Sequence, residues 1–599
     1  MDPLARPSSI HSTNFLAAGS VAWKVKPGAT ANLVHRQTWR IACILLLGVA
    51  VSALSAVGQT ASTGAIAGLV TDPSGALVAG ARVKVNNEGT GENRIVVTGE
   101  QGSFLAPLLP PGSYRVEVSK SGFKLSTFPH VRVNVTETER VNVHLAVGNV
   151  SETVTVSSEA EQLQTESSAL GRVATAEVVN NLPLVTRNYT QILGLSPGVS
   201  GDVTNAANIG RGDTSASGLA GGYSVHGAGT TDNNFQMNGS QVNDLMGAGN
   251  FSGGVPVPNP DSIQEFKVQT GQYDASYGRN AGANVDVITK SGTNVYHGSA
   301  WEYFRNTSLN ANDYFLNAAR KPRGVLDQNQ FGFAFGGPVK KDELFYFVSY
   351  QGTRQRNGLS SGCLSTGDLP LGLTNDAANR SAAALAAAFS GQSGVLGGTI
   401  SSAADISPTA LATLNAQLPN GQFLIPAPSN TTTGQTTFSS PCTYDEDQFV
   451  ADVDYYQSNK SHYSPKFFFM NGEQVGTLPP TTLGFPTVSL PGSAQSNAPA
   501  FRDFSLTHTY IANNHLLNQA VLGFHRLSLL LDQKYPNVTF ATQACTTSTA
   551  GSLSLASLCV PAPPLPTLFR ISAWEAHLPS AAMARASLAP KTTIVSMTL

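Results

Sequence analysis

Residues 262–292 read SIQEFKVQTGQYDASYGRNAGANVDVITKSG, and this stretch decides the fold. Its first part, Ile263 to Gly271, mixes apolar and polar residues and ends at a glycine. A Tyr-Gly pair follows at residues 277–278, and a glycine-rich stretch then leads into an apolar run that ends in Ile-Thr-Lys at residues 288–290.

The segment before this stretch contains loops and a short helix. Residues 201–254 are rich in Gly, Asn, Ser and Ala, which is typical of surface loops. Upstream of them, the pattern from Leu170 to Leu182 predicts a short helix that ends near Pro183.

The segment from His297 onward has the pattern of outer-membrane strands. Phe331, Phe333 and Phe335 place three rings on one face, and aromatic residues on alternating strands are typical of transmembrane barrels. A soluble sandwich is the alternative. Residues 351–445 are rich in Ser, Ala, Gly and Asn, and we interpret them as one long extracellular loop of an antiparallel barrel over 293–564.

Residues 62–148 show the period of two that strands require. Tyr114, Val116 and Val118 alternate with charged residues, and similar short runs recur about every ten residues between Gly- and Pro-containing turns. This spacing predicts an N-terminal β-sandwich.

Two ordered sets of turns in this half resemble known modules. The sandwich segment, with GLVTDPSG at residues 68–75 and LPPGSY at residues 109–114, resembles the carboxypeptidase regulatory-like domain, a transthyretin- or carbohydrate-binding-like sandwich that is not itself catalytic. Residues 162–292 resemble the small α/β plug domain of TonB-dependent outer-membrane receptors, with an Asn-Gly turn at 238–239 before the stretch quoted above. The combination looks most like the Oar-like branch of that family, which carries this sandwich.

The linker over residues 151–161 holds a candidate TonB box. Its residues are Glu152, Thr153, Val154, Thr155 and Val156. In the family that it resembles, a short extended segment here adds as a strand to a TonB-type periplasmic energiser. The alternative is that the same residues form the last strand of the sandwich.

Residues 1–58 are interpreted as an N-terminal extension and a secretory signal. The apolar run from Ile41 to Val57 follows Arg36 and Arg40 and ends at a small-residue cleavage pattern, Ala56-Val57-Gly58. An uncleaved membrane anchor is the alternative, although such a helix needs about 20 residues.

The cysteines outside that segment are even in number. An even set in an exported chain indicates disulfides, and four cysteines allow about three pairings. The spacing of the cysteines favours pairing between neighbours in the sequence. A zinc site is disfavoured, since no C-x-x-C motif or paired His accompanies the cysteines. The candidates are Cys363 with Cys442 and Cys545 with Cys559.

Composition and missing motifs exclude several functions. The 599 residues carry 36 Lys and Arg against 38 Asp and Glu, a net charge of −2, which argues against nucleic-acid binding. No H-E-x-x-H, H-x-x-E or P-loop is present, so no enzyme, catalytic residue, cofactor or metal site is expected. The G-x-S-x-G match at residues 194–198 contains Pro197, which lacks the N–H that an oxyanion hole needs.

The sequence therefore predicts a mainly β protein of the outer membrane that acts as a TonB-dependent receptor. Its expected partners are the energiser, outer-membrane lipid, and an extracellular oligosaccharide, peptide or protein. The rival is a secreted carbohydrate-binding or adhesion protein. A plugged barrel of about 22 strands does not fit into the residues after Gly292, so we expect roughly six to ten strands. Residues 565–599 lose the alternation and form an atypical tail, so we also expect a truncated receptor that does not work alone.

Overall fold

The computed structural model describes most of the chain after the first 61 residues. Residues 1–58 form a separate unit that lies outside the described residues, and so does the predicted signal. Among the described residues, no helix is both long and apolar enough to cross a membrane. The described residues are 62–149, 153–155, 168–184, 186–201, 210, 223–229, 232–243, 255–273, 277–278, 280–312, 314, 317, 323–358, 363–392, 399–418, 421–439, 441–476, 494–513, 516–534 and 592–598.

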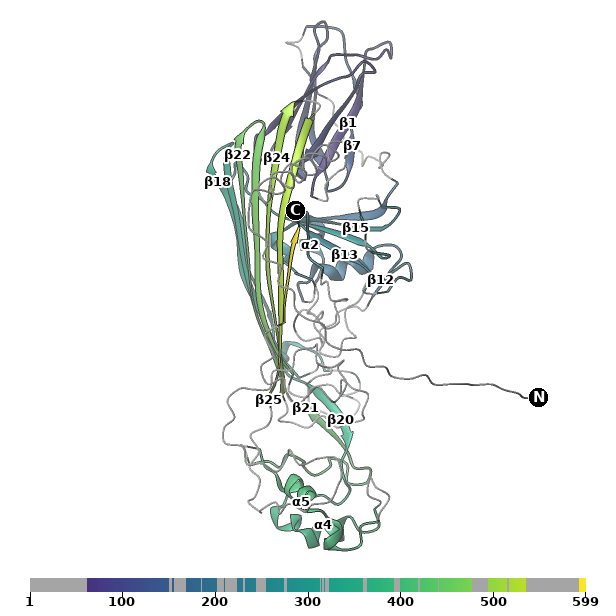
Figure 1. The fold of residues 1–599 in the computed structure, drawn as a ribbon, viewed down its shortest axis with the longest axis vertical. Coiled ribbons are helices and arrows are strands. Elements are labelled where there is room, and N and C mark those ends of the chain that lie inside the picture. The colour runs from purple at the N-terminus through teal and green to yellow at the C-terminus, as the bar shows by residue number, and fades with distance from the viewer. Residues whose placement is uncertain are drawn as a thin grey trace, which may run out of the picture. The chain divides into compact units, whose positions relative to one another are not determined.

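The N-terminal part folds as two sheets, as the sequence predicts (Figure 1). One sheet pairs β4 (Ser103–Leu109), β1 (Gly64–Thr71), β7 (Thr138–Arg140) and β8 (Val143–His144). The other has the order β3 (Asn93–Val97), β2 (Arg82–Asn87), β5 (Gly112–Ser119), β6 (Leu125–Val133) and β9 (Thr153–Thr155).

Alternation of buried and exposed residues explains this sandwich. In β5, Tyr114, Val116 and Val118 are buried in the core between the sheets, while the residues between them face outward or lie half-buried. The Tyr114 hydroxyl donates to the Pro110 carbonyl at 2.7 Å, which satisfies its polar end. Burying each valine side chain contributes about 1.5–3 kcal/mol.

The segment predicted to be a plug, called the plug below, forms a five-stranded sheet with short helices. The sheet order is β10 (Leu170–Thr175), β15 (Ile263–Gly271), β16 (Asn284–Thr289), β13 (Asn234–Met237) and β14 (Ser240–Gln241). The remaining elements are α2 (Ala176–Asn181), η2 (Tyr189–Leu195), β11 (Val199–Gly201), β12 (Tyr223–Val225) and η3 (Pro260–Ser262).

The helix expected over residues 170–182 is only half correct. Residues 170–175 form β10, which pairs antiparallel with β15 over its whole length, and the helix begins at Ala176. Pairing with a distant strand overrides the local helical pattern, as tertiary contacts commonly do.

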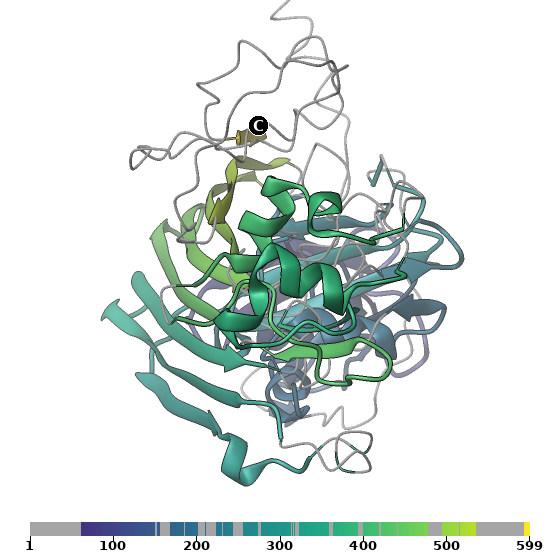
Figure 2. The same ribbon diagram turned by 90° about the horizontal axis from the view of Figure 1, so that it is seen from below.

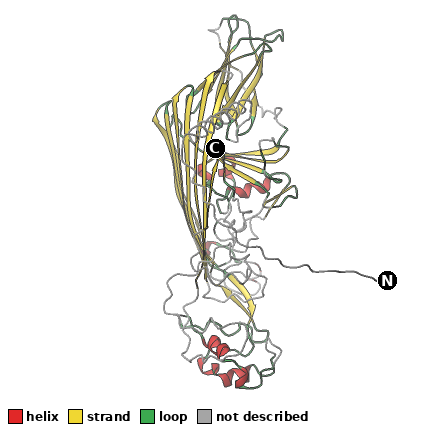
Figure 3. Cartoon of the chain, in the orientation of Figure 1, coloured by secondary structure: helices red, strands yellow, loops and turns green. Residues whose placement is uncertain are grey.

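The third part is an eight-stranded antiparallel sheet that lies within the predicted six to ten strands. Strands dominate the chain, as Figure 3 shows. Over the described residues the sheet is an open run with β17 and β26 at its edges. Its members, in order, are β17 (His297–Arg305), β18 (Leu326–Lys340), β19 (Leu344–Asn357), β22 (Cys442–Ser458), β23 (Ser461–Gly476), β24 (Ala494–Asn513), β25 (Leu516–Lys534) and β26 (Thr592–Thr598).

The insertion after β19 is shorter and more ordered than expected. The sequence predicts a loop over 351–445, but β19 continues to Asn357 and β22 begins at Cys442, because both ends pair in register with each other. Between them lie the paired strands β20 (Leu364–Asp368) and β21 (Gln435–Ser439) and the helices that Figure 2 shows in the foreground, α4 (Ala382–Ala388) and α5 (Pro408–Asn415).

The insertion has its own small core. Leu385 and Phe389 of the α4 region pack with Leu411 and Leu414 of α5. The buried Arg380 guanidinium stacks over the Phe423 ring at 3.7 Å, and its Nε donates to the Thr374 carbonyl at 2.7 Å. The predicted loop therefore contains a small folded subdomain.

A disulfide joins Cys363 to Cys442 at the base of this insertion, the pairing expected from spacing. Their Cα atoms lie 5.5 Å apart, and both residues are buried with Tyr444. Cys545 and Cys559 lie outside the described residues, so their pairing stays a prediction that mass mapping of non-reduced peptides would test.

Candidate functional site

The central part of the candidate TonB box lies on the edge of the sandwich. Thr153–Thr155 form β9, which pairs parallel with β6 in the register Leu125–Thr153, Ser126–Val154 and Thr127–Thr155. All three β9 residues are exposed, so the pairing rests mainly on backbone hydrogen bonds. Glu152 and Val156 lie outside the described residues. The segment is thus extended and accessible, in the position that the sandwich-strand alternative anticipated.

The pairing of β9 is close to thermodynamic balance. Each backbone hydrogen bond contributes about 0.5–1.5 kcal/mol net, whereas fixing each residue costs about 1–2 kcal/mol. Three exposed residues add little apolar burial to offset that cost. The backbone pairing therefore holds β9 on β6 with little net free energy.

A buried polar joint connects the sandwich to the plug. The Val135 backbone N–H donates a short hydrogen bond to the Glu265 carboxylate, and Lys267 forms an ion pair with Glu137 at 3.1 Å. Lys267 Nζ also approaches the Thr136 carbonyl at 3.5 Å. Glu265 and Lys267 both belong to β15 and are almost fully buried, so one plug strand carries the plug side of this joint.

The joint holds more carboxyl groups than cations. Burial raises the pKa of Glu265 to about 7, while the Val135 N–H acts in the opposite direction. Asp286 lies opposite Lys267 on β16, and burial raises its pKa to about 7 although the Tyr277 hydroxyl donates to it at 3.0 Å. Both carboxyls therefore change protonation near neutral pH.

The end of β16 makes a second polar contact, this time with the barrel sheet. The Thr289 hydroxyl donates to the Asp452 carboxylate at 2.5 Å. Lys466 of β23 pairs with Asp452 of β22 at 3.1 Å and donates to the Thr289 carbonyl at 3.2 Å and the Ser291 hydroxyl at 3.2 Å. The Ile-Thr-Lys segment is thus held by two neighbouring barrel strands.

Arg187 makes a third contact between plug and barrel. It adopts a left-handed backbone with φ of 52° and forms an ion pair with Asp261. Its Nε donates to Gln351 of β19 at 2.9 Å, and its guanidinium lies 4.5 Å from the centre of the Tyr303 ring of β17. A buried cation shared by a carboxylate, an amide and an aromatic ring stabilises one position of the plug.

An apolar core continues from the plug into the barrel sheet. One cluster of buried residues unites plug side chains such as Val268 and Val285 with barrel side chains such as Phe347, Phe468 and Phe501. The plug sheet is therefore packed against one face of the barrel sheet rather than joined to it only through the chain.

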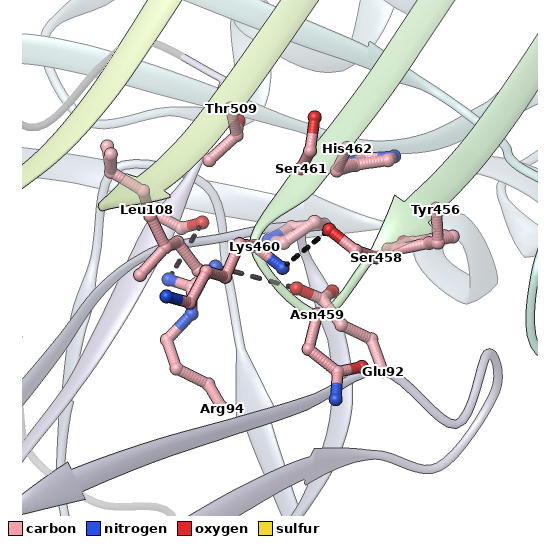
Figure 4. Close-up of a pocket in the computed structure, with 12 residues that line it drawn as sticks. Glu92, Arg94, Leu108, Tyr456, Ser458, Asn459, Lys460, Ser461, His462 and Thr509 are labelled. Atoms are coloured by element: carbon pink, nitrogen blue, oxygen red, sulfur yellow. Dashed lines mark hydrogen bonds and ion pairs between the residues drawn. The ribbon is translucent and has the colours of Figure 1, made fainter. Parts of the chain in front are cut away.

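The hollow in Figure 4 lies where the sandwich meets the turn between β22 and β23. Arg94, Leu108 and Glu92 come from the sandwich, while Lys460 comes from the turn and His462 from β23. The hollow holds about 10 Å³, roughly one water molecule, which is too small for a transported ligand. It is a seam between two parts of the chain. No group of His, Cys, Asp or Glu that could hold a metal ion occurs among the described residues.

Sequence reasoning missed the charged residues of these contacts. Lys267 and Glu265 stand inside a predicted strand, where buried charges are rare unless paired, and that anomaly was the available signal. The three acids at 445–447 fall within β22: Glu446 accepts from the buried Tyr444 hydroxyl, and Asp447 pairs with Arg354 at 2.9 Å.

Comparisons with known proteins agree with this architecture. A model of the outer membrane beta barrel domain matches residues 288–565, and a model of the carboxypeptidase regulatory-like domain matches residues 65–146. The TonB-dependent transporter Oar of Myxococcus xanthus is 27% identical over 286 residues. In these comparisons the chain is similar to the Oar-like TonB-dependent receptors. The matched part of this Oar-like chain covers 44% of it and 25% of the Myxococcus protein, so the chain spans about a quarter of that relative's length.

Solved structures of outer-membrane receptors also match the Oar-like chain. The outer membrane transporter YddB from Escherichia coli is 11% identical with a TM-score of 0.37, covering 62% of this chain and 41% of its own. The ferric enterobactin receptor PfeA from Pseudomonas aeruginosa is 14% identical with a TM-score of 0.34, covering 61% and 42%. The barrel domain and the Oar relative place the chain in the outer membrane.

Proposed function

We propose that the chain supplies the plug and part of the barrel of a TonB-dependent receptor, which binds an extracellular ligand and moves it with energy from the inner membrane. The observation that carries this proposal is the single apolar core shared by the plug sheet and the barrel sheet. A plug packed this way blocks a path through the barrel until it is moved. The ligand is an oligosaccharide, a peptide or a protein, and lipid surrounds the strands.

The mechanism uses binding and force, with no bond chemistry. Ligand contacts at the extracellular side favour one plug position, and the energiser pairs with residues 152–156 from the periplasm by strand addition. Pulling on this segment then shifts the polar contacts that Thr289 and Arg187 make with the barrel sheet. The protein switches between two plug positions rather than deforming continuously. Cys363–Cys442 and Cys545–Cys559 are proposed to stabilise the extracellular side.

Binding of the energiser tests the proposal. The full chain is purified from outer membranes in detergent and titrated with the periplasmic domain of a TonB-type energiser from the same host. Val154→Pro removes a backbone donor from the candidate box, so we expect binding to weaken at least about tenfold, while the matched Val154→Ala stays near the parent. Equal binding of all three chains would refute the box and the proposed role.

Membrane fractionation distinguishes the rival function. A receptor whose strands span the bilayer stays with the outer membrane through a high-salt wash. A secreted carbohydrate-binding or adhesion protein would be released by the same wash, and its release would overturn the proposal.

A further inference from the structure

The sandwich edge offers a defined place for an added strand. In the five-stranded sheet of the sandwich, β9 is the outermost strand and its one neighbour among the described residues is β6. An edge strand presents a row of backbone donors and acceptors that is open to another chain. We propose that the sandwich presents β9 as a docking edge, onto which the energiser's strand adds as a sixth strand without displacing β9 from β6. This inference rests on the proposed function of residues 152–156.

Strand β6 is interrupted just beyond the part that β9 covers. Pro129 lacks a backbone donor, and His130 adopts a left-handed φ of 58°. The register of β6 with β5 shifts across these residues, which marks a bulge. Proline and bulges are features that prevent strand addition at an edge. β6 pairs with β5 over residues 126–128 and again over 131–133, and β9 lies beside residues 125–127, before the bulge.

The exposure of β9 fits an incoming strand. Thr153, Val154 and Thr155 are all exposed, and the Val154 side chain keeps 37% of its surface accessible. The segment is already extended, so an added strand meets a backbone that has lost part of its conformational freedom. Such preorganisation strengthens binding because less ordering remains to be done. A strand with neighbours on both sides is also held more firmly than an edge strand, so energiser binding should consolidate β9 on β6.

The test locks β9 to the sandwich. Thr127 and Thr155 are register partners on adjacent strands, which lie about 4.8 Å apart, within the range that a disulfide spans. The double variant Thr127→Cys/Thr155→Cys is prepared in the full chain, oxidised or reduced, and titrated with the energiser's periplasmic domain. We expect the oxidised form to bind as tightly as the reduced form, or up to about tenfold tighter. A loss of about tenfold or more on oxidation, restored by reduction, would overturn the inference, because it would show that β9 must leave β6.

A second measurement avoids substitutions altogether. Hydrogen exchange of the parent chain is followed at residues 125–127 and 153–155 with and without the energiser domain. Addition to the outer edge of β9 predicts slower exchange at 153–155 with no loss of protection at 125–127. Faster exchange at 125–127 would refute docking on the sandwich. The two claims are refuted by different results. The proposed function is refuted when Val154→Pro leaves energiser binding unchanged. The docking inference alone is refuted when Val154→Pro abolishes binding and the locked chain also does not bind.

Discussion

Lys267→Met tests whether the buried joint holds the sandwich to the plug. The substitution keeps the length of the side chain but removes the buried cation that pairs with Glu137 at 3.1 Å. Breaking a buried pair costs about 3–5 kcal/mol, because the remaining charge stays desolvated. The Glu137 side chain keeps 12% of its surface exposed and can partly rehydrate, so we expect about 2–3 kcal/mol here.

Hydrogen exchange at Val135 measures this loss. Its N–H donates to Glu265, so the amide exchanges when the joint opens. A cost of about 2 kcal/mol corresponds to roughly thirtyfold faster exchange. Lys84→Met is the matched control: Lys84 pairs with Glu117 at 3.6 Å on the surface, where such a pair contributes at most about 1 kcal/mol.

A double-mutant cycle completes the measurement. If Lys267 acts through Glu137, Lys267→Met and Glu137→Gln together cost less than the sum of the two single changes, by about 1–3 kcal/mol. Val135 exchange that is the same in Lys267→Met and Lys84→Met would refute the reasoning, since it would show that the joint does not depend on this ion pair.

Three further outcomes follow from the same contacts. Burial raises the pKa of Glu265 from 4.5 to about 7, so the folded joint binds this proton more tightly than the unfolded chain does. The stability of the joint therefore falls as pH rises from about 4.5 to 7, by up to about 3 kcal/mol. The substitution Glu265→Gln should flatten the pH dependence of hydrogen exchange at Val135. Lys466→Met leaves Asp452 buried without its cation, and we expect protease to cut the plug faster, whereas equal rates would contradict the plug–barrel contact. Arg380→Lys loses the planar stacking on Phe423, so the insertion should become sensitive to protease while the barrel strands do not; unchanged resistance would exclude this role.

Local pattern was sufficient to predict most strands. Tyr114, Val116 and Val118 alternate because one face of β5 is buried, and the same rule located the sandwich and the hairpins of the barrel sheet. The resemblance to the plug family supplied the expected order of the plug strands, including the Asn238-Gly239 turn, where Asn238 takes a φ of 51° and Gly239 a φ of 77°. These features depend on neighbours in sequence, which a single chain displays directly.

Local sequence pattern could not predict contacts between distant segments. The Val135–Glu265 hydrogen bond joins residues 130 positions apart, and nothing in the local sequence of either segment specifies the other. The error at residues 170–175 has the same origin, since β10 is a strand only because β15 lies beside it. The insertion was misjudged because its core is built from sparse leucines within a low-complexity composition.

Strand β15 has a mechanical consequence for any pull from the periplasm. The chain that follows the box enters the plug through β10, which pairs with β15. The sandwich that carries the box also contacts side chains of β15, through the ion pair between Glu137 and Lys267. Tension applied at β9 thus has two routes, one through peptide bonds and one through the ion pair, and they converge on one strand. The ion pair carries part of the tension until the joint between sandwich and plug opens. After that, the tension acts on β10 alone and separates it from β15. The receptor would therefore yield in two steps, with the pH of the periplasm setting the force of the first.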